Sequence, residues 1–243
     1  MKQHEAVIEA MKRNGGYATL GYLYQNAINV PGVEWKTKTP FASIRRIVQD
    51  SRFFYKIKPG LWALKEFRNK LPKALTPRKT TKTKNSLFNH SYYQGLIVQI
   101  GNLKGYDTYI PPQDKNKIFL KKPLSSVSKL TKIYDFSYPN ILRKAKTVDV
   151  IWFNDRKLPS SFFEVEHSTN IANSLSKFYE LQDYNSKFFI VSSTARKREF
   201  DDKIESRIFR DIKSRVSFVD YDFIANYHSR TFEMSLLSSK VSL

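Results

Sequence analysis

Apolar residues in the first part of the chain recur three times at helical spacing and then switch to alternation. The first stripe ends at the glycine pair at 15–16, the second begins after Thr19, and the third begins after Thr39. Threonine favours the position that precedes a helix, and glycine favours the position that follows one. Residues 53–64 then alternate in two short runs around a Lys-Pro-Gly turn. This pattern predicts three helices followed by a β-hairpin.

A different composition follows at residues 66–86. The segment is basic and rich in threonine, is interrupted by Pro72 and Pro77, and has no sustained apolar repeat. Such segments act as linkers that are ordered at most in short pieces. We therefore expect an N-terminal domain at residues 1–65 and a larger C-terminal domain at residues 87–243.

Helical and strand patterns alternate in the C-terminal domain. A helical stripe at 86–105 precedes a short strand, "YDTYIPP", and two longer strands, "KTVDVIWFND" and "SFFEVEHS". Helix, strand, helix, strand and helix patterns follow, with one charged helix expected at 198–214. A strand pair that leads through a helix into a buried strand predicts a mixed sheet covered by helices. The expected fold class is α/β.

Charge narrows the choice of partner. The 243-residue chain has 42 Lys and Arg against 22 Asp and Glu, which gives a formal net charge of +20. A field of that sign concentrates polyanions around the protein, so nucleic acid is the expected partner and an anionic membrane surface the lesser one. The absence of cysteine excludes disulfides, thiolate zinc sites and a cysteine nucleophile.

The N-terminal sequence, "MKQHEAVIEAMKRNGG", is charged throughout and lacks the apolar segment of a signal peptide. The chain has no run of about 18 apolar residues, the length that a membrane-spanning helix needs. We therefore expect a cytoplasmic protein that does not associate with membranes.

Two acidic residues stand out against this basic background. Glu164 and Glu166 lie one residue apart in the strand "SFFEVEHS", so their side chains share one face of the sheet. Asp149 lies in the neighbouring strand, and cross-strand neighbours approach to roughly 5 Å between Cβ atoms. Three carboxylates in one cleft repel each other, and a divalent cation with oxygen ligands would offset that repulsion. The other interpretation is a solvated strand face, or ion pairs with the abundant Lys and Arg.

The N-terminal pattern resembles winged helix-turn-helix domains. The third helix, "TPFASIRRIVQDS", and the hairpin, "FFYKIKPGLWAL", carry the resemblance, which covers about residues 1–65. In that family the third helix enters the major groove of DNA, and the hairpin, or wing, contacts the backbone or the minor groove. The resemblance implies six DNA-contacting residues: Ser43, Arg45, Arg46 and Gln49 from the third helix, and Lys56 and Lys58 on the wing. A solvated helix face, or the binding of protein or RNA, is the alternative.

The sequences "TVDVIW" and "FFEVEHS" resemble the motif of the PD-(D/E)XK nuclease superfamily, which includes many restriction endonucleases. The resemblance covers about residues 87–237 and implies a restriction-endonuclease-like core, a mixed sheet with flanking helices. Asp149 stands at the position of the motif's Asp, and Glu164 stands at the second acidic position. Two positions depart from the motif, because Val148 replaces its proline and Glu166 replaces its lysine.

The resemblance implies a sequence-specific endonuclease that uses Mg²⁺ (or Mn²⁺) to hydrolyse double-stranded DNA to 5′-phosphate and 3′-hydroxyl ends, as type II restriction enzymes do. Asp149 and Glu164 would hold the metal, and Glu166 would help a metal-bound water to lose its proton or would hold a second metal. Superfamily members often use a residue of the preceding helix at the metal site, which implies a role for Gln94. Lys177, in the helix after the second strand, could reach a phosphate.

Double-strand cleavage needs two active sites, so the resemblance also implies a homodimer. A type II restriction role would imply a cognate DNA methyltransferase. Two other interpretations stay open: a non-catalytic winged-helix regulator with an inactive nuclease-like domain, and a nuclease that acts on transposon ends or repair junctions. An RNA substrate is a further alternative.

Overall fold

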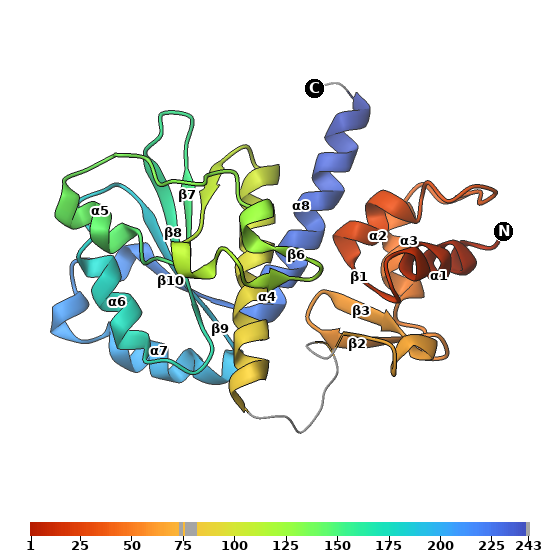
Figure 1. Cartoon of the computed structure of the whole chain (residues 1–243), viewed down its shortest axis with the longest axis horizontal. Coiled ribbons are helices and arrows are strands. Elements are labelled where there is room, and N and C mark those ends of the chain that lie inside the picture. The colour runs from red at the N-terminus through yellow and green to blue at the C-terminus, as the bar shows by residue number, and fades with distance from the viewer. Residues whose placement is uncertain (73–74, 76–81, 242–243) are drawn as a thin grey trace. The chain divides into compact units, whose positions relative to one another are not determined.

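The computed structural model describes the backbone of residues 1–72, 75 and 82–241, and the side chains of residues 1–72, 75 and 89–239. Residues 73–74 and 76–81 of the expected linker therefore lie outside the described residues. Contacts within the chain define two compact units (Figure 1), Met1–Thr80 with Ala225–Leu243 and Thr81–Ile224. This division differs from the expected C-terminal domain, because the end of the last helix belongs with the first unit.

The first unit contains three short helices and a three-stranded antiparallel sheet of order β1-β3-β2. The elements are α1 (Gln3–Arg13), β1 (Tyr17–Thr19), α2 (Leu20–Asn26), α3 (Pro40–Ile47), β2 (Phe54–Lys58) and β3 (Leu61–Leu64). The helices and the hairpin match the predicted pattern, but the pattern does not predict β1. Three residues are too few for alternation to show. Gly15 and Gly16, both at positive φ, turn the chain back after α1 and so allow β1 to form.

The two predicted helix caps have different outcomes. Thr19 caps α2, since its hydroxyl accepts a hydrogen bond from the backbone N–H of Tyr22 at 3.3 Å. Thr39 makes no side-chain cap bond to α3, although Pro40 occupies the first turn of that helix. Thr39 thus occupies the predicted position before α3, but its hydroxyl lies 3.3 Å from the hydroxyl of Thr37 instead of bonding to the helix.

The last helix, α8 (Tyr221–Val241), begins in the second unit and ends in the first. Within the first unit its Phe232 packs directly on α2 at Gly21. A Cβ atom on Gly21 would lie only 2.6 Å from the Phe232 ring, so the close approach of these helices needs a glycine there. This packing explains why the end of α8 groups with the N-terminal residues.

The second unit is built on a five-stranded sheet of order β10-β9-β8-β7-β4. The strands are β4 (Asp107–Tyr109), β7 (Val150–Phe153), β8 (Pro159–Glu166), β9 (Lys187–Ser192) and β10 (Val216–Asp220). β7 pairs antiparallel with both β4 and β8, whereas β9 pairs parallel with both β8 and β10. The predicted mixed sheet and the α/β class are therefore confirmed.

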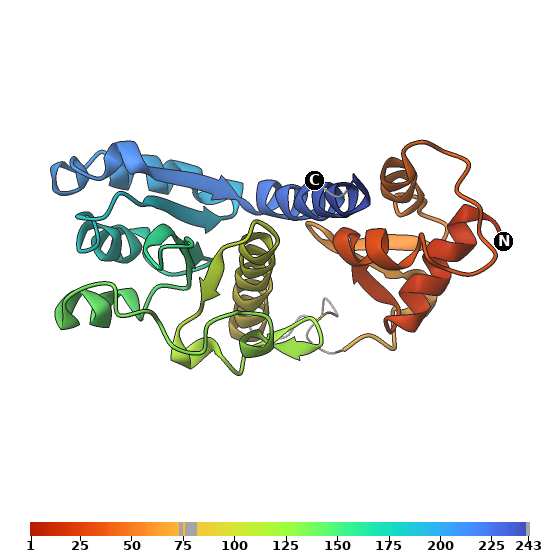
Figure 2. The same cartoon turned by 90° about the horizontal axis from the view of Figure 1, so that it is seen from above.

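Helices cover both faces of this sheet, with α4 on one side and α6 and α7 on the other (Figure 2). The helices of the unit are α4 (Lys82–Leu103), α5 (Pro139–Ala145), α6 (Ile171–Tyr179) and α7 (Lys197–Ile204). The charged helix expected at 198–214 is shorter than predicted. It ends at Ile204, and isolated 3₁₀ turns follow at Arg207–Phe209 and Lys213–Arg215.

The connection from β4 to β7 holds short elements that the sequence pattern does not predict. They are the 3₁₀ turns Pro112–Asp114 and Leu124–Ser126, the small hairpin of β5 (Ile118–Phe119) and β6 (Lys122–Pro123), and α5. Further 3₁₀ turns lie at Lys65–Phe67 and Thr194–Arg196. Across the described part of the chain, no helix combines the length and the apolar character needed to cross a membrane.

Alternation along β7 and β8 sends side chains to opposite faces of the sheet. Phe162 packs with Ile151 in the apolar core that α6 and α7 cover. Phe163 faces the side of α4, where its ring lies 4.5 Å from that of Trp152. Trp152 in turn donates a hydrogen bond to the carbonyl of Ile97 on α4 at 3.2 Å. Glu164 and Glu166 follow Phe162 at intervals of two, so they lie on the α6 face.

We expect Gly95→Ala to destabilise the protein by about 1–3 kcal/mol, the usual range for overpacking a core. A Cβ on Gly95 would meet the ring of Phe119 at 2.2 Å, whereas alanine on an open helix face would stabilise by about 1 kcal/mol. Urea unfolding measures the difference. Truncating Phe119 to alanine in the same chain should remove most of the penalty, and a Gly95→Ala variant as stable as wild type would contradict the packing.

Candidate active site

The three carboxylates singled out in the sequence lie in one pocket of the second unit. Asp149 directly precedes β7, and Glu164 and Glu166 lie at the end of β8. All three are buried, with 9%, 3% and 4% of their surface exposed, yet each lines a pocket of about 360 Å³. Burying charged groups without partners is unfavourable, so the contacts of each carboxylate decide what the pocket can do.

Asp149 is held in place from two directions. Its Oδ2 accepts a hydrogen bond from the backbone N–H of Val165 at 2.7 Å, which ties it to β8. Its own backbone carbonyl accepts a bond of 2.7 Å from Nε2 of Gln94 on α4. Gln94 is fully buried and also donates to Oδ2 of Asp114 at 2.8 Å. The structure therefore brings Gln94 beside Asp149, where it contacts the backbone of that residue.

Glu164 has a cation and a hydroxyl beside it. Nζ of Lys177 on α6 lies 3.0 and 2.8 Å from its two carboxylate oxygens, and the Ser174 hydroxyl donates to Oε2 at 3.1 Å. Burial and the charge of Asp149 raise the pKa of Glu164 above its ordinary value, while Lys177 opposes the rise. The carboxylate thus sits in surroundings with too little positive charge to offset its burial.

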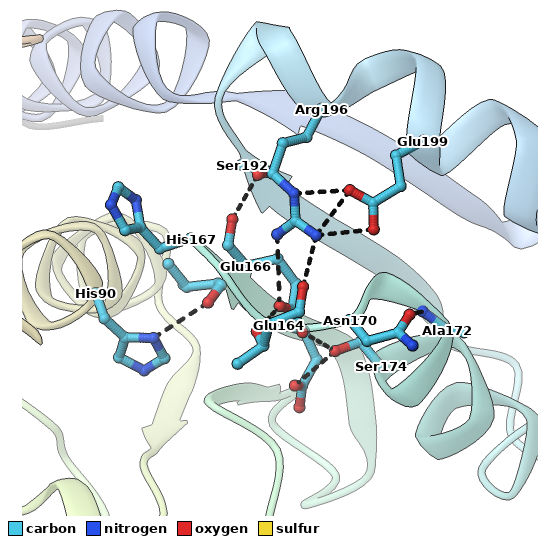
Figure 3. Close-up of polar contacts among 12 residues, drawn as sticks. His90, Glu164, Glu166, His167, Asn170, Ala172, Ser174, Ser192, Arg196 and Glu199 are labelled. Carbon is cyan, nitrogen blue, oxygen red and sulfur yellow. Dashed lines mark hydrogen bonds and ion pairs between the residues drawn. The ribbon is translucent and has the colours of Figure 1, made fainter. Parts of the chain in front are cut away.

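Glu166 is surrounded by hydroxyl groups (Figure 3). The hydroxyls of Thr169 and Ser174 donate to its two carboxylate oxygens, and Arg196 Nη1 lies 3.9 Å from Oε2. Ser174 therefore bonds to both Glu164 and Glu166, and links the two acidic residues of β8 to α6. The backbone carbonyl of Glu166 also accepts a hydrogen bond from the Ser192 hydroxyl on β9. Hydroxyl groups thus hold both oxygens of the Glu166 carboxylate in place.

Sequence reasoning missed two residues at this site, His90 and Asp114. His90 Nε2 lies 3.4 Å from both Asp114 Oδ2 and Asp149 Oδ1, and these three side chains form a group that could hold a metal ion. Asp114 ends a short 3₁₀ turn in the segment "PPQDKNK", which is too short to carry a periodic signal. His90 could have been found, because it precedes Gln94 by four residues and so shares one face of α4 with it.

Opposing effects determine the pKa values of His90 and Asp114. Burial disfavours the charged imidazole of His90, but the charges of Asp149 and Asp114 outweigh it and raise the pKa of His90 to about 10. Burial likewise disfavours ionised Asp114, but the adjacent imidazole of His90, the ammonium group of Lys117 and the hydrogen bond from Gln94 lower the pKa of Asp114 to about 2. Positive charge placed at this point is therefore strongly stabilised.

The six residues expected to contact DNA lie in the first unit with unequal exposure. Arg46, Gln49 and Lys56 are exposed, whereas Ser43, Arg45 and Lys58 are partly buried. Arg45 has partners within the protein. Its Nη1 donates to the Tyr24 hydroxyl at 3.0 Å and lies 2.7 Å from the carboxylate of Glu233 on α8.

The sequence that forms the second unit matches a known family of proteins. Residues 59–238 match the family described as the Type II restriction enzyme NmeDI C-terminal domain, so the chain belongs to this restriction-enzyme family. A curated relative is the type II restriction enzyme NmeDI of Neisseria meningitidis serogroup C. It is 21% identical over 163 residues, which cover 63% of this chain and 46% of the relative. The chain thus spans about half the length of that relative. No solved structure matches the chain.

Proposed function

We propose that the protein is a metal-dependent endonuclease that cuts double-stranded DNA at specific sequences, with a PD-(D/E)XK nuclease domain in the second unit. The observation that carries the proposal is the meeting of Asp149, Glu164 and Glu166 in one pocket of a chain with net charge +20. A basic protein attracts the DNA backbone, and clustered carboxylates can hold the cation that phosphodiester hydrolysis uses. Membership of a restriction-enzyme family supports the same function.

The donor atoms fit a hard divalent cation. Carboxylate oxygens are the ligands that Mg²⁺ and Mn²⁺ prefer, and the repulsion from Asp149 that raises the pKa of Glu164 would be relieved by a positive ion. Held by Asp149 and Glu164, the ion would polarise the scissile phosphate and make water more acidic. Gln94 would keep Asp149 in position through its bond to the Asp149 carbonyl.

Glu166 is the proposed proton acceptor for the attacking water. Its carboxylate lines the pocket, and hydroxyl donors from Thr169 and Ser174 hold it in a fixed orientation. A general base must lie within hydrogen-bond reach of the proton it removes, and a fixed carboxylate at the pocket wall meets that need. The attack on phosphorus would leave 5′-phosphate and 3′-hydroxyl ends.

The motif usually carries a lysine at the position that Glu166 occupies in this chain. Lys177 would take over the role of that lysine. Its Nζ lies within 3.0 Å of both carboxylate oxygens of Glu164, and its side chain lines the pocket. A preorganised ammonium group there would stabilise the negative charge that develops on the phosphate oxygens. The positive charge that the motif places on the second strand thus comes from helix α6 in this chain.

The first unit is proposed to bind DNA as a winged helix. Its order of helix, strand, helix, helix and hairpin supports this assignment, with α3 entering the major groove. Arg46 and Gln49 are exposed on that side and could reach base edges or phosphates. Arg45 would brace α3 against α8 through Glu233, and Lys56 would contact the backbone from the wing.

The affinity for duplex DNA is expected to fall steeply with salt. Binding to DNA releases the counterions condensed on the phosphates that the protein neutralises, so added salt opposes binding. If the protein neutralises about six phosphates, its affinity should fall about a thousandfold between roughly 50 and 200 mM monovalent salt. Fluorescence anisotropy with a labelled duplex in EDTA, repeated across that range, gives the slope. A Kd that stays flat would show that phosphate contacts do not dominate binding.

Incubation of the protein with phage DNA, in Mg²⁺ and in EDTA, tests the proposed activity. Discrete fragments that require Mg²⁺ and disappear in Glu164→Gln are expected. DNA that is retarded but intact in every lane would support the non-catalytic regulator, and preferential cutting of branched DNA would support a repair or transposon nuclease. Comparing methylated with unmethylated DNA tests for a partner methyltransferase, and sedimentation with DNA tests for the proposed homodimer.

A further inference from the structure

We propose that His90, Asp114 and Asp149 form a cation site with one imidazole and two carboxylate ligands, which takes Mn²⁺ and similar transition-metal ions. Their ligand atoms all lie within 4.8 Å of one another, and all three residues belong to the second unit. The site shares Asp149 with the proposed Mg²⁺ ligands but does not use Glu164. It requires neither DNA nor cleavage, so it can be tested apart from the proposed nuclease activity.

The hydrogen bonds of His90 determine which of its nitrogens is available. Nδ1 lies 3.1 Å from the backbone carbonyl of Val165, and a carbonyl can only accept, so Nδ1 carries a proton (Figure 3). In the neutral ring, Nε2 then has an unshared electron pair. That atom is buried and has no hydrogen-bond partner among the described residues. It faces Asp114 Oδ2 and Asp149 Oδ1, each 3.4 Å away, which are acceptors as well.

Three acceptors that face each other need either a proton or a metal ion at their centre. A second observation concerns Gln94, whose side chain is completely buried and whose amide nitrogen reaches the same cluster. Its Oε1 has no hydrogen-bond partner in the described part of the chain. Native proteins rarely leave a buried amide oxygen unsatisfied, and an ion with its bound water would supply the missing donor.

Further hydrogen bonds and ion pairs fix the orientation of each proposed ligand. A metal-binding histidine usually donates its other N–H to a carbonyl or carboxylate, as His90 does to Val165. Asp149 Oδ2 is held by the backbone N–H of Val165. Asp114 Oδ1 lies 2.5 Å from Lys117 Nζ, which leaves its Oδ2 directed at His90. Such supporting contacts hold ligand atoms in place before an ion arrives.

The ligand types select the kind of ion. Mg²⁺ strongly prefers oxygen ligands, whereas a site with one imidazole and two carboxylates also suits transition-metal ions, because imidazole favours ions such as Zn²⁺ and Fe²⁺ and the carboxylates favour Mn²⁺. Three protein ligands leave positions open for water, and His90 and Asp149 line the pocket through which these positions can be reached. The competing explanation is a doubly protonated His90 that holds the two carboxylates without any metal.

Pulsed electron paramagnetic resonance of Mn²⁺ bound to the full chain, without DNA, separates these explanations. We expect ¹⁴N modulation from a directly bound imidazole, its loss in His90→Gln, and at least tenfold weaker Mn²⁺ binding in Asp114→Asn. His167→Gln is the matched control, because His167 lines the same pocket outside the cluster, and it should keep the modulation.

Glu164→Gln should also keep the ¹⁴N modulation while abolishing the proposed cleavage, so the failure of one proposal does not imply failure of the other. Wild-type protein that binds no Mn²⁺, or binds it without ¹⁴N modulation, would overturn the site and favour the doubly protonated histidine. Modulation that persists in His90→Gln would overturn it too. If His90→Gln fails to fold, the wild-type spectrum and the Mn²⁺ affinity of Asp114→Asn still test the proposed site.

Discussion

We expect Asp149→Asn to lower the rate of the proposed Mg²⁺-dependent DNA cleavage by about three orders of magnitude and to change the Kd for duplex DNA by less than about threefold. Asparagine keeps the shape of the side chain and an oxygen that can accept the 2.7 Å bond from Val165. It removes the negative charge that a divalent cation needs. The lost stabilisation of the transition state amounts to about 4 kcal/mol, since each 1.4 kcal/mol changes a rate tenfold. Single-turnover cleavage and anisotropy in EDTA measure the two effects.

Asp155→Asn is the matched control for this variant. Asp155 lies six residues further along the chain, exposed in the turn between β7 and β8, and does not line the pocket. It should cleave at the wild-type rate. If Asp149→Asn retained cleavage within about tenfold of wild type, Asp149 would not be a metal ligand in the reaction. Thermal unfolding of both variants checks that the fold is intact.

We expect Lys177→Met to lower the rate of the proposed cleavage by about a hundredfold and, in EDTA, to lower the free energy of unfolding by about 2 kcal/mol. Methionine keeps the apolar stem of the side chain but removes the ammonium group within 3.0 Å of both Glu164 oxygens. Glu164 is then left buried beside Asp149 and Glu166, without a contacting cation among the residues that the structure describes. Part of the loss is offset because Glu164, whose pKa is already raised, takes up a proton more readily.

Lys144→Met provides the comparison for a surface ion pair. Lys144 lies 2.6 Å from Glu180, and 35% and 51% of the two side chains are exposed, so its loss should change stability by less than about 0.5 kcal/mol. Lys177→Arg should restore part of the cleavage rate, because it restores the charge with a different shape. Full activity in Lys177→Met would remove this lysine from the proposed mechanism, whatever its effect on stability.

The extent of the family match bears on how the two units contribute. The match covers residues 59–238 and therefore includes every residue that lines the acidic pocket. Helices α1 to α3 all lie before residue 59. The pocket thus belongs to the part that this chain shares with the restriction-enzyme family, while the proposed recognition helix α3 lies outside that part.

The sequence alone determined the α/β class and the acidic positions of β8. Alternation in "SFFEVEHS" placed Glu164 and Glu166 on one face, and the structure confirms that Phe163 lies on the other, because the period of a strand is strict. Long periodic helices such as α4 and α6 were also predicted. Strand β1 and the β5–β6 hairpin were missed, since two or three residues are too few to display a period.

Only the tertiary structure decided what surrounds the carboxylates. Lys177 reaches Glu164 because α6 returns over β8, and Asp114 reaches His90 because the segment that holds its 3₁₀ turn folds back onto α4. Arg45, expected to face DNA, meets Glu233 from the far end of the chain. Local periodicity reports which face a residue occupies, but it contains no information on which distant segment covers that face. Contacts between such segments depend on the packing of the whole chain, so they could not be predicted from the pattern of the sequence.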